Sequence, residues 1–342
     1  MSLTQDTFAF VADLVRRRSA IQLEAGKEYL VESRLLPIAR DGGHAGVDAY
    51  VREVRAAQRE ADLKQIVDAL TTNETSWFRD NTPFSALRTH IIPALRAERP
   101  VLDTLRIWSA ACSTGQEPYS LAMTLSDVLG PGARFAITAT DLSERVLAQA
   151  RSGRYSQLEV NRGLPAPMMV RYFSRAGHEW QIAEELRRAI TFQQHNLLDM
   201  PPHGPFDIVF LRNVLIYFDL ETKRSILSRV HRVLKPGGFL VLGAAETTIG
   251  VDQDWERMPV ERGSVYRPVQ AGVVPTPRSA PAAPAGLPTP AAGRAPFGSA
   301  PRAPAPTFTR PGLSRPSTTT LPPARLRPSG PTGSAFEQGV TR

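Results

Sequence analysis

The first 70 residues carry apolar side chains at the spacing of amphipathic helices. Phe8, Val11 and Val15 recur at helical intervals and form one apolar stripe. No run in this region alternates apolar and polar residues as a half-buried strand does. The pattern predicts four helices, Thr4–Ser19, Lys27–Arg40, Val47–Ala57 and Ala61–Leu70. We therefore expect an all-helical unit at residues 1–70, in which Pro37 kinks the second helix or ends it early.

From Leu105 onward, short apolar runs alternate with helical stripes. Such runs are typical of strands that are buried on both faces of a sheet. The predicted strands are Leu105–Ala110, Phe135–Thr140, Ile190–Gln194, Phe206–Leu211 and Phe239–Gly243, followed by an antiparallel pair at Trp255–Met258 and Ser264–Arg267. The alternation predicts an α/β domain at residues 105–267, with a mostly parallel sheet between helices. Residues 153–194 interrupt the alternation and are interpreted as a small insertion, a short hairpin.

A polar segment that contains two aromatic residues joins the two units. TTNETSWFRD (Thr71–Asp80) runs from small polar side chains directly into a Trp-Phe pair and an arginine. A plain linker would not place these residues together, although two core aromatics beside a helix cap are an alternative. Thr82 is expected to cap a helix that has Pro83 at its first position and reaches about Leu95. Residues 71–104 are thus predicted to be a connecting segment and helix.

The first strand leads into a turn that can meet a ligand. The turn Ala111–Gly115 has one glycine, so it lacks the G-x-G-x-x-G pattern that cradles a diphosphate. Glu117 would repel a diphosphate at the start of the next helix, where Pro118 is expected at the first position. The turn favours a nucleoside with a positive centre, such as S-adenosylmethionine; an ordinary turn with a solvated glutamate is the alternative. Asp141 ends the second strand, where it can accept both ribose hydroxyls.

The charge of the chain is concentrated in its last residues. The chain has 342 residues and a formal net charge of +8, of which residues 268–342 carry +7. Because the rest is nearly neutral, the high pI does not indicate nucleic-acid binding. Residues 268–342 also hold 17 of the 30 prolines and few large apolar residues, which predicts a disordered tail. The tail is a linker, a tether or a segment for an unknown partner, or else a passive extension.

The single cysteine and the lack of long apolar runs limit the cellular compartments in which the protein is expected. Cys112 has no partner for an internal disulfide, which fits a reducing compartment. No apolar leader and no apolar run of about 18 residues is visible. We therefore expect a soluble cytoplasmic protein without membrane insertion. The six histidines and Cys112 show no metal-ligand spacing, so no metal site is expected.

Four motifs follow one another in a distinctive order. They are TTNETSWFRD (Thr71–Asp80), SAACSTGQEPYSLA (Ser109–Ala122), HNLLD (His195–Asp199) and FLRNVLIYFD (Phe210–Asp219), supported by TDLSERVL (Thr140–Leu147) and LKPGGFLVLGAAE (Leu234–Glu246). Together, over about Leu3–Arg267, the chain resembles the chemotaxis receptor glutamate methyltransferases of the CheR type. The resemblance implies an all-helical N-terminal domain and a class I S-adenosylmethionine methyltransferase domain, Rossmann-like, with a small β insertion. It also implies an enzyme of sensory adaptation that methylates glutamate side chains on the cytoplasmic helices of chemotaxis receptors.

The resemblance assigns roles to individual residues. It implies receptor contact for Arg34 and Arg40 on the second helix, where a solvated surface is the alternative. It implies that Arg79 and Tyr217 lie beside the transferred methyl group. It implies cofactor contacts for Asn73, Thr75, Arg79, Glu117, Asp141, Asn196, Leu197, Arg212 and Asn213, with Asp141 on the ribose and Asn196 on the adenine edge.

Two departures from the family pattern limit this transfer. The loop after the last parallel strand reads Gly243-Ala244-Ala245-Glu246, where many members have a His-Ser pair, so no histidine role is carried over. The insertion also looks short for gripping a tether peptide at the C-terminus of a receptor. Direct docking on the receptor helices is therefore expected.

The implied reaction needs no general base. A glutamate side chain, with a pKa of about 4.3, is already ionised at neutral pH and can attack a methyl group directly. The site must supply alignment and a dry pocket, so we expect Tyr217 to orient the attacking oxygen and Arg79 to pair with a carboxylate of the cofactor or the substrate. Two other functions remain open: a methyltransferase of a small molecule, and a non-catalytic receptor-binding scaffold with a relic pocket.

Overall fold

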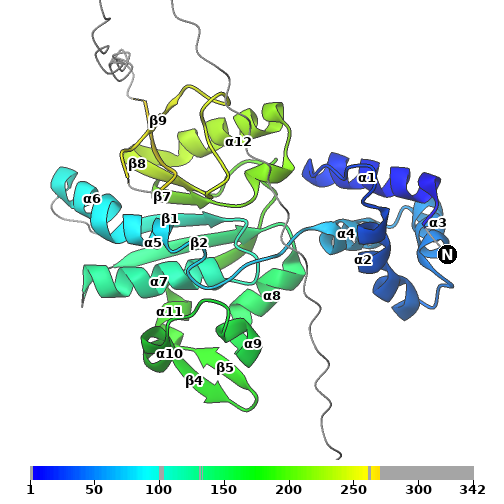
Figure 1. Cartoon of the computed structure of the whole chain (residues 1–342), viewed down its shortest axis with the longest axis horizontal. Helices are drawn as coiled ribbons and strands as arrows, with labels where there is room; N and C mark the ends of the chain where they lie inside the picture. Colours follow the sequence, from blue (N-terminus) through cyan, green and yellow to red (C-terminus); the bar gives the residue numbers. More distant parts are fainter. Residues whose placement is uncertain (1–2, 100–103, 131, 133, 261–262, 270–342) are drawn as a thin grey trace, which may run out of the picture. The chain divides into compact units, whose positions relative to one another are not determined.

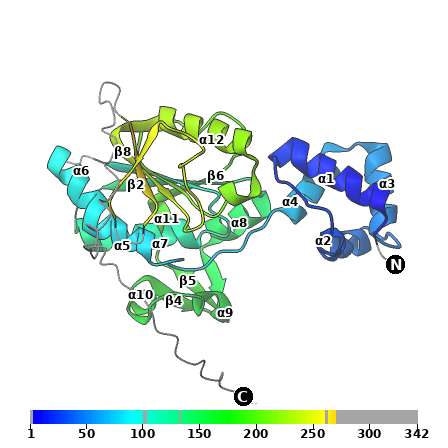
Figure 2. The ribbon, with the colours of Figure 1, turned by 45° about the horizontal axis from the view of Figure 1, so that its top comes forward.

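A computed structural model describes residues 3–99, 104–130, 132, 134–260 and 263–269 (Figures 1 and 2). Within these residues, a seven-stranded sheet has the order β6-β2-β1-β7-β8-β10-β9. Its strands are β1 (Leu105–Ala110), β2 (Phe135–Asp141), β6 (Ile190–Gln194), β7 (Phe206–Leu211), β8 (Leu234–Leu242), β9 (Trp255–Arg257) and β10 (Val265–Pro268). The first five run parallel to one another, and β10 is antiparallel to both β8 and β9. The predicted mostly parallel sheet with a final antiparallel pair is confirmed.

Helices cover both faces of this sheet. Figures 1 and 2 show α7 (Gln116–Leu129) and α8 (Glu144–Ser152) on one face and α12 (Leu220–Val233) on the other. All six residues of β7 are buried because the strand lies mid-sheet between two apolar layers. The strand order reverses between β1 and β7, and ligands bind at such a switch point, outside the carboxyl ends of the strands.

The N-terminal helices have an apolar core of their own. They are α1 (Gln5–Ser19), α2 (Glu28–Asp41), α3 (Val47–Ala57) and α4 (Glu60–Leu70), as the apolar stripes predicted. Val11, Leu35 and Ile66 are fully buried in this core. The expectation that Pro37 ends the second helix early is wrong. The exposed Pro37 sits inside α2, while Leu35 and Ala39 on the buried face keep the helix packed through it.

The insertion is larger than the predicted hairpin. It forms a three-stranded antiparallel sheet in the order β3-β5-β4, in which β4 and β5 make the hairpin (Figure 1). Its elements are β3 (Arg154–Ser156), α9 (Gln157–Val160), α10 (Ala166–Tyr172), β4 (Phe173–Ala176), β5 (Glu179–Ile182) and α11 (Glu184–Arg188). Tyr155 fastens it to the main domain, because the Tyr155 hydroxyl donates to the Thr114 carbonyl at 2.8 Å.

Several predicted helix ends are displaced. Between the two units the chain forms α5 (Thr82–Ala86), the π-helical turn η1 (Leu87–Ile91) and α6 (Ile92–Glu98). Asn81, and not Thr82, is the residue before α5. Pro118 is the third residue of α7, because the helix begins directly after Gly115, at Gln116, two residues before the expected start. The strand predicted at Phe239–Gly243 begins earlier, at Leu234, so that β8 includes the Lys-Pro-Gly-Gly run at residues 235–238.

The tail predicted at residues 268–342 lies outside the described residues beyond position 269. Among the helices that the structure describes, none combines the length and apolar character needed to cross a membrane.

Candidate active site

One pocket lies at the carboxyl ends of the central strands. It encloses about 880 Å³, including the part open to solvent. All ten residues that were predicted to contact the cofactor or the transferred methyl line this pocket, although they come from distant parts of the sequence. They are Asn73, Thr75, Arg79, Glu117, Asp141, Asn196, Leu197, Arg212, Asn213 and Tyr217. The structure thus brings these side chains together, while the contact of each with a ligand stays a prediction.

The turn after β1 is shaped around the Asp141 carboxylate. Asp141 accepts the N–H of Ser113 at 2.8 Å and the N–H of Ser143 at 3.0 Å. Burial raises the pKa of the Asp141 carboxyl, and these two N–H groups oppose that rise. Gly115 has a φ of +94°, and a Cβ there would lie 2.9 Å from the Ala150 Cβ. The single glycine of the turn is therefore required both by its conformation and by the close approach of α8.

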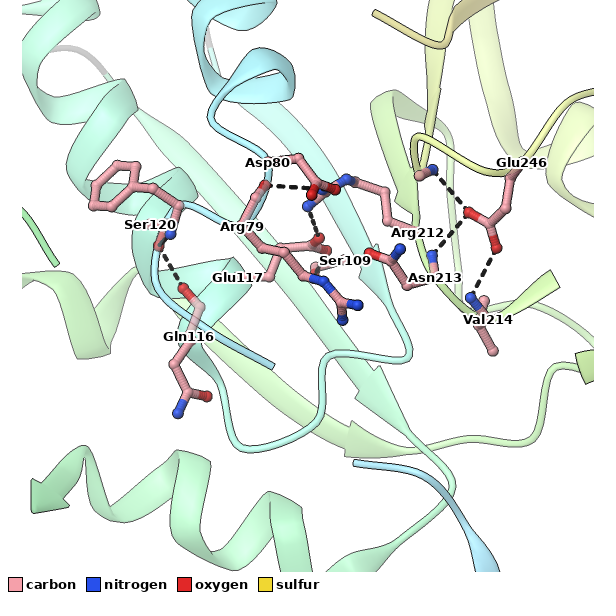
Figure 3. A network of polar contacts seen from close by, with 12 residues as sticks. Arg79, Asp80, Ser109, Gln116, Glu117, Ser120, Arg212, Asn213, Val214 and Glu246 are labelled. Atoms are coloured by element: carbon pink, nitrogen blue, oxygen red, sulfur yellow. Dashed lines mark hydrogen bonds and ion pairs between the residues drawn. The ribbon is translucent and has the colours of Figure 1, made fainter. Parts of the chain in front are cut away.

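Arg212 forms the centre of a buried ionic network (Figure 3). Its guanidinium donates to Glu117 Oε2 at 2.9 Å, to Asp80 Oδ2 at 2.7 Å and to the Arg79 carbonyl at 2.9 Å. Ser109 donates to the other oxygen of Glu117 at 2.8 Å. Glu117 was expected to contact a cofactor with a positive centre, yet here it already faces a cation of the protein. Arg212 consequently joins the end of β7, the start of α7 and the segment that carries Arg79.

The segment that carries Arg79 has an unusual backbone. Phe78, Asp80 and Asn81 have φ values of 48°, 68° and 48°, a left-handed region that is uncommon for residues other than glycine. The Phe78 N–H donates to Ser120 Oγ at 3.1 Å, and Phe78 is buried in the core. The aromatic pair is thus part of the core, as the alternative interpretation held, and it anchors a strained turn that presents Arg79. The Arg79 guanidinium itself donates to the Glu74 carbonyl at 2.9 Å.

The far end of the pocket includes residues that sequence reasoning missed. Ser19 and Ile21, at the end of α1, line it together with His195. Asn196, expected on the adenine edge, donates its side-chain amide to the Arg18 carbonyl at 2.7 Å. Burial lowers the pKa of His195, whose Nε2 lies 2.9 Å from the Met200 carbonyl oxygen. No local signal could reveal Ser19 and Ile21, because their part depends on how the helical unit packs.

The two predicted docking arginines differ in their surroundings, and neither lines this pocket. Arg34 donates to the carbonyls of Leu70 and Thr71 at 2.9 and 2.8 Å, and burial lowers its pKa. Arg34 therefore holds the start of the connecting segment. Arg40 is exposed at the end of α2 and is available to a partner.

In the described part of the chain, no three His, Cys, Asp or Glu side chains gather as a metal site would require.

The sheet and its pocket define a class of enzyme. A seven-stranded sheet with this order, a carboxylate after the second strand and no phosphate-cradling glycine pattern is that of a class I S-adenosylmethionine-dependent methyltransferase. The lining fits this cofactor, with apolar side chains such as Ile21 and Leu142 for a base and charged side chains such as Arg79 and Glu117 for an amino-acid group.

Comparison with known sequences identifies the family. Residues 73–263 match the family described as CheR methyltransferase, SAM binding domain, and residues 6–71 match its all-alpha domain. The chain therefore belongs to the CheR methyltransferase family, and S-adenosylmethionine is its cofactor. It is 40% identical to the chemotaxis protein methyltransferase Cher2 of Pseudomonas putida over 74% of this chain and 94% of that protein. It is 40% identical to chemotaxis protein methyltransferase 1 of Pseudomonas aeruginosa over 78% and 99%, and 37% identical to the chemotaxis protein methyltransferase of Escherichia coli over 72% and 86%.

Proposed function

We propose that this methyltransferase modifies glutamate side chains on the cytoplasmic helices of chemotaxis receptors and forms glutamate methyl esters. The relatives named as chemotaxis protein methyltransferases match nearly the full length of the described chain, which supports a substrate in that pathway. The observation that carries the proposal is the pocket that Arg79 and Tyr217, which are far apart in the sequence, line together with Asp141. The proposed substrate would place the enzyme in the cytoplasm, with no nucleic acid as partner.

The chemistry requires positioning and not proton removal. S-adenosylmethionine supplies an electrophilic methyl group on a sulfonium. One γ-carboxylate oxygen of the substrate forms a bond to the methyl carbon, and the methyl–sulfur bond breaks with its electron pair left on sulfur. The carboxylate is already ionised at pH 7, so no base is needed. The protein has to hold the oxygen, the methyl carbon and the sulfur in line.

Arg79 and Tyr217 have different parts in this proposal. The Tyr217 hydroxyl donates to one substrate oxygen and so aims the other at the methyl group. The negative charge of the carboxylate disappears as it reacts, so strong pairing with Arg79 in the ground state would slow the step. Arg79 therefore positions a carboxylate and does not activate it. Arg40, exposed on α2, is suited to a receptor surface that carries glutamates.

A methyl-transfer assay tests the proposal. Purified protein is incubated with tritiated S-adenosylmethionine and receptor-containing membranes, and the counts released as methanol in alkali are measured. We expect base-labile labelling of the receptor, strongly reduced in Arg79→Ala and Tyr217→Phe, while the exposed control Glu221→Gln labels like the unchanged protein.

Each other function predicts a different result in the same assay. Base-stable counts on the receptor would contradict ester formation, and counts on a small molecule without receptor would indicate another substrate class. Cofactor binding without any transfer would favour a scaffold. Near-normal transfer by both variants would refute the roles given to Arg79 and Tyr217.

A further inference from the structure

Glu246, in the loop after β8, is a buried carboxylate that accepts four backbone N–H groups. Figure 3 shows its contacts with Asn213 and Val214. Its Oε2 accepts from Gly243 at 2.7 Å and from Asn213 at 2.8 Å. Its Oε1 accepts from Val214 at 2.8 Å and from Leu215 at 2.7 Å. Four converging donors require a group that only accepts, and the ionised carboxylate is such a group. Glu246 thus occupies a concave nest of N–H groups in the way a bound anion does.

Three of these donors are consecutive residues because the chain turns sharply after β7. Asn213 has a φ of +57°, which directs its own N–H and the next two toward one point. Asparagine adopts this left-handed region more readily than most residues with a side chain, and the contacts with Glu246 stabilise it further. The turn η2 (Leu215–Tyr217) follows directly, so the Glu246 carboxylate fixes the backbone between Asn213 and Tyr217.

Gly243 brings the two loops into contact. A Cβ on Gly243 would lie 2.7 Å from Glu246 Oε2, 2.9 Å from the Asn213 backbone nitrogen and 2.9 Å from Asn213 Nδ2. No real side chain tolerates such distances from backbone, so position 243 needs glycine for the loops to approach. The Asn213 and Tyr217 side chains line the cofactor pocket, whereas Gly243 and Glu246 are not among its lining residues.

We propose that Glu246 is a positioning residue of this methyltransferase, which holds Asn213 and Tyr217 in place without touching cofactor or substrate. Its carboxylate offsets the cost of the left-handed turn at Asn213 and fixes the loop that presents both side chains. The part that concerns Tyr217 rests on the proposed function. The part that concerns Asn213 rests on cofactor binding and is measured without a receptor.

Glu246→Gln tests the proposal, because the amide keeps one acceptor oxygen and turns an NH₂ group toward two N–H donors. Binding of S-adenosylhomocysteine is measured by calorimetry, and methyl transfer to receptor is measured at saturating cofactor. We expect the Kd to rise at least about tenfold with one site per chain retained, and kcat to fall by a similar factor. The matched control is Glu221→Gln, on the exposed side of α12, which should change neither value.

The stoichiometry separates positioning from a purely structural role. Loss of folded protein lowers the number of sites per chain and leaves the Kd of the remaining sites unchanged. Gly243→Ala provides an independent variant, since it keeps the carboxylate but forces the two loops apart, and it should weaken binding in the same way. Glu246→Asp keeps the charge on a shorter side chain and should give an intermediate Kd.

Two outcomes decide the matter. A Kd and a kcat both within about twofold of the unchanged protein in Glu246→Gln would overturn the proposal. If Glu246→Gln does not fold, the same criterion applies to Gly243→Ala and Glu246→Asp. Failure of the unchanged protein to label receptor would refute the proposed substrate, yet it would leave the binding experiment fully interpretable.

Discussion

Arg212→Met leaves the Glu117 and Asp80 carboxylates without the cation that both contact. Methionine is apolar and follows the arginine side chain as far as Nε, so it fills most of the space of the Arg212 side chain, which is 1% exposed, and lacks only the guanidinium group. The variant therefore measures the ionic network itself. It also removes the hydrogen bond to the Arg79 carbonyl, one of the supports of the strained turn.

The magnitude follows from the exposure of each carboxylate. An ion pair with charge centres about 4 Å apart is worth about 4 kcal/mol at an effective dielectric constant of about 20. The Glu117 side chain is 13% exposed and keeps most of this value. Asp80 is 36% exposed, so solvent screening reduces its pair to at most about 1 kcal/mol. Because removal of one partner leaves a buried charge, we expect the free energy of unfolding to fall by about 3–5 kcal/mol.

Urea unfolding, followed by the fluorescence of the four tryptophans, measures this loss. Glu117→Gln in the Arg212→Met background removes the unpaired charge and should recover about 2 kcal/mol, so the double-mutant cycle reports a favourable coupling. A loss below about 1 kcal/mol in the single variant, or additive effects in the cycle, would refute the view that Glu117 is neutralised by Arg212.

Three further predictions concern the pocket and its surroundings. We expect Asp141 to accept the ribose hydroxyls in its ionised form, so affinity for S-adenosylhomocysteine should fall as pH drops through the raised pKa of Asp141, while Asp141→Asn should bind weakly at every pH. An affinity of the unchanged protein that does not vary with pH would contradict this. Burial raises the pKa of the Cys112 thiol, so iodoacetamide should label this thiol far more slowly in native protein than in urea-unfolded protein. Equal labelling rates would contradict the burial of Cys112. Arg40→Ala should raise only the KM for receptor. Arg34→Ala should raise this KM and also lower the free energy of unfolding in urea by about 1–3 kcal/mol, because it loses its bonds to two carbonyls. Equal changes of KM and of stability in the two variants would argue against distinct roles.

The sheet and the helices were predictable because residues that become buried recur at regular intervals along the sequence. β7 is a run of apolar residues interrupted only by Asp207, and α12 carries Ile226, Leu227 and Val230 on one buried face. The errors concern boundaries that tertiary packing decides. Helix α2 continues through Pro37 because its neighbours on the buried face hold it, and β8 begins early because Leu234 pairs with Phe206 across the sheet. The strand order itself was not predicted, since pairing partners far apart in sequence leave no local trace.

Sequence reasoning predicted those residues of the candidate site that lie within short motifs. Asp141 follows from its place after a strand, and the other nine pocket residues follow from the family motifs. What sequence reasoning missed are contacts between those residues. No local sequence pattern indicates that Asn196 donates to the Arg18 carbonyl or that Arg212 pairs with Glu117. Nor does one indicate that Glu246 accepts N–H groups from a loop about thirty positions away.

The bond from Asn196 to Arg18, beside Ser19 and Ile21 in the pocket wall, has a consequence for exchanging parts between relatives. The N-terminal helical unit cannot be exchanged independently, because the end of its first helix, α1, completes the pocket that the methyltransferase domain builds. Chimaeras joined near position 72 must therefore keep the end of α1 matched to its host.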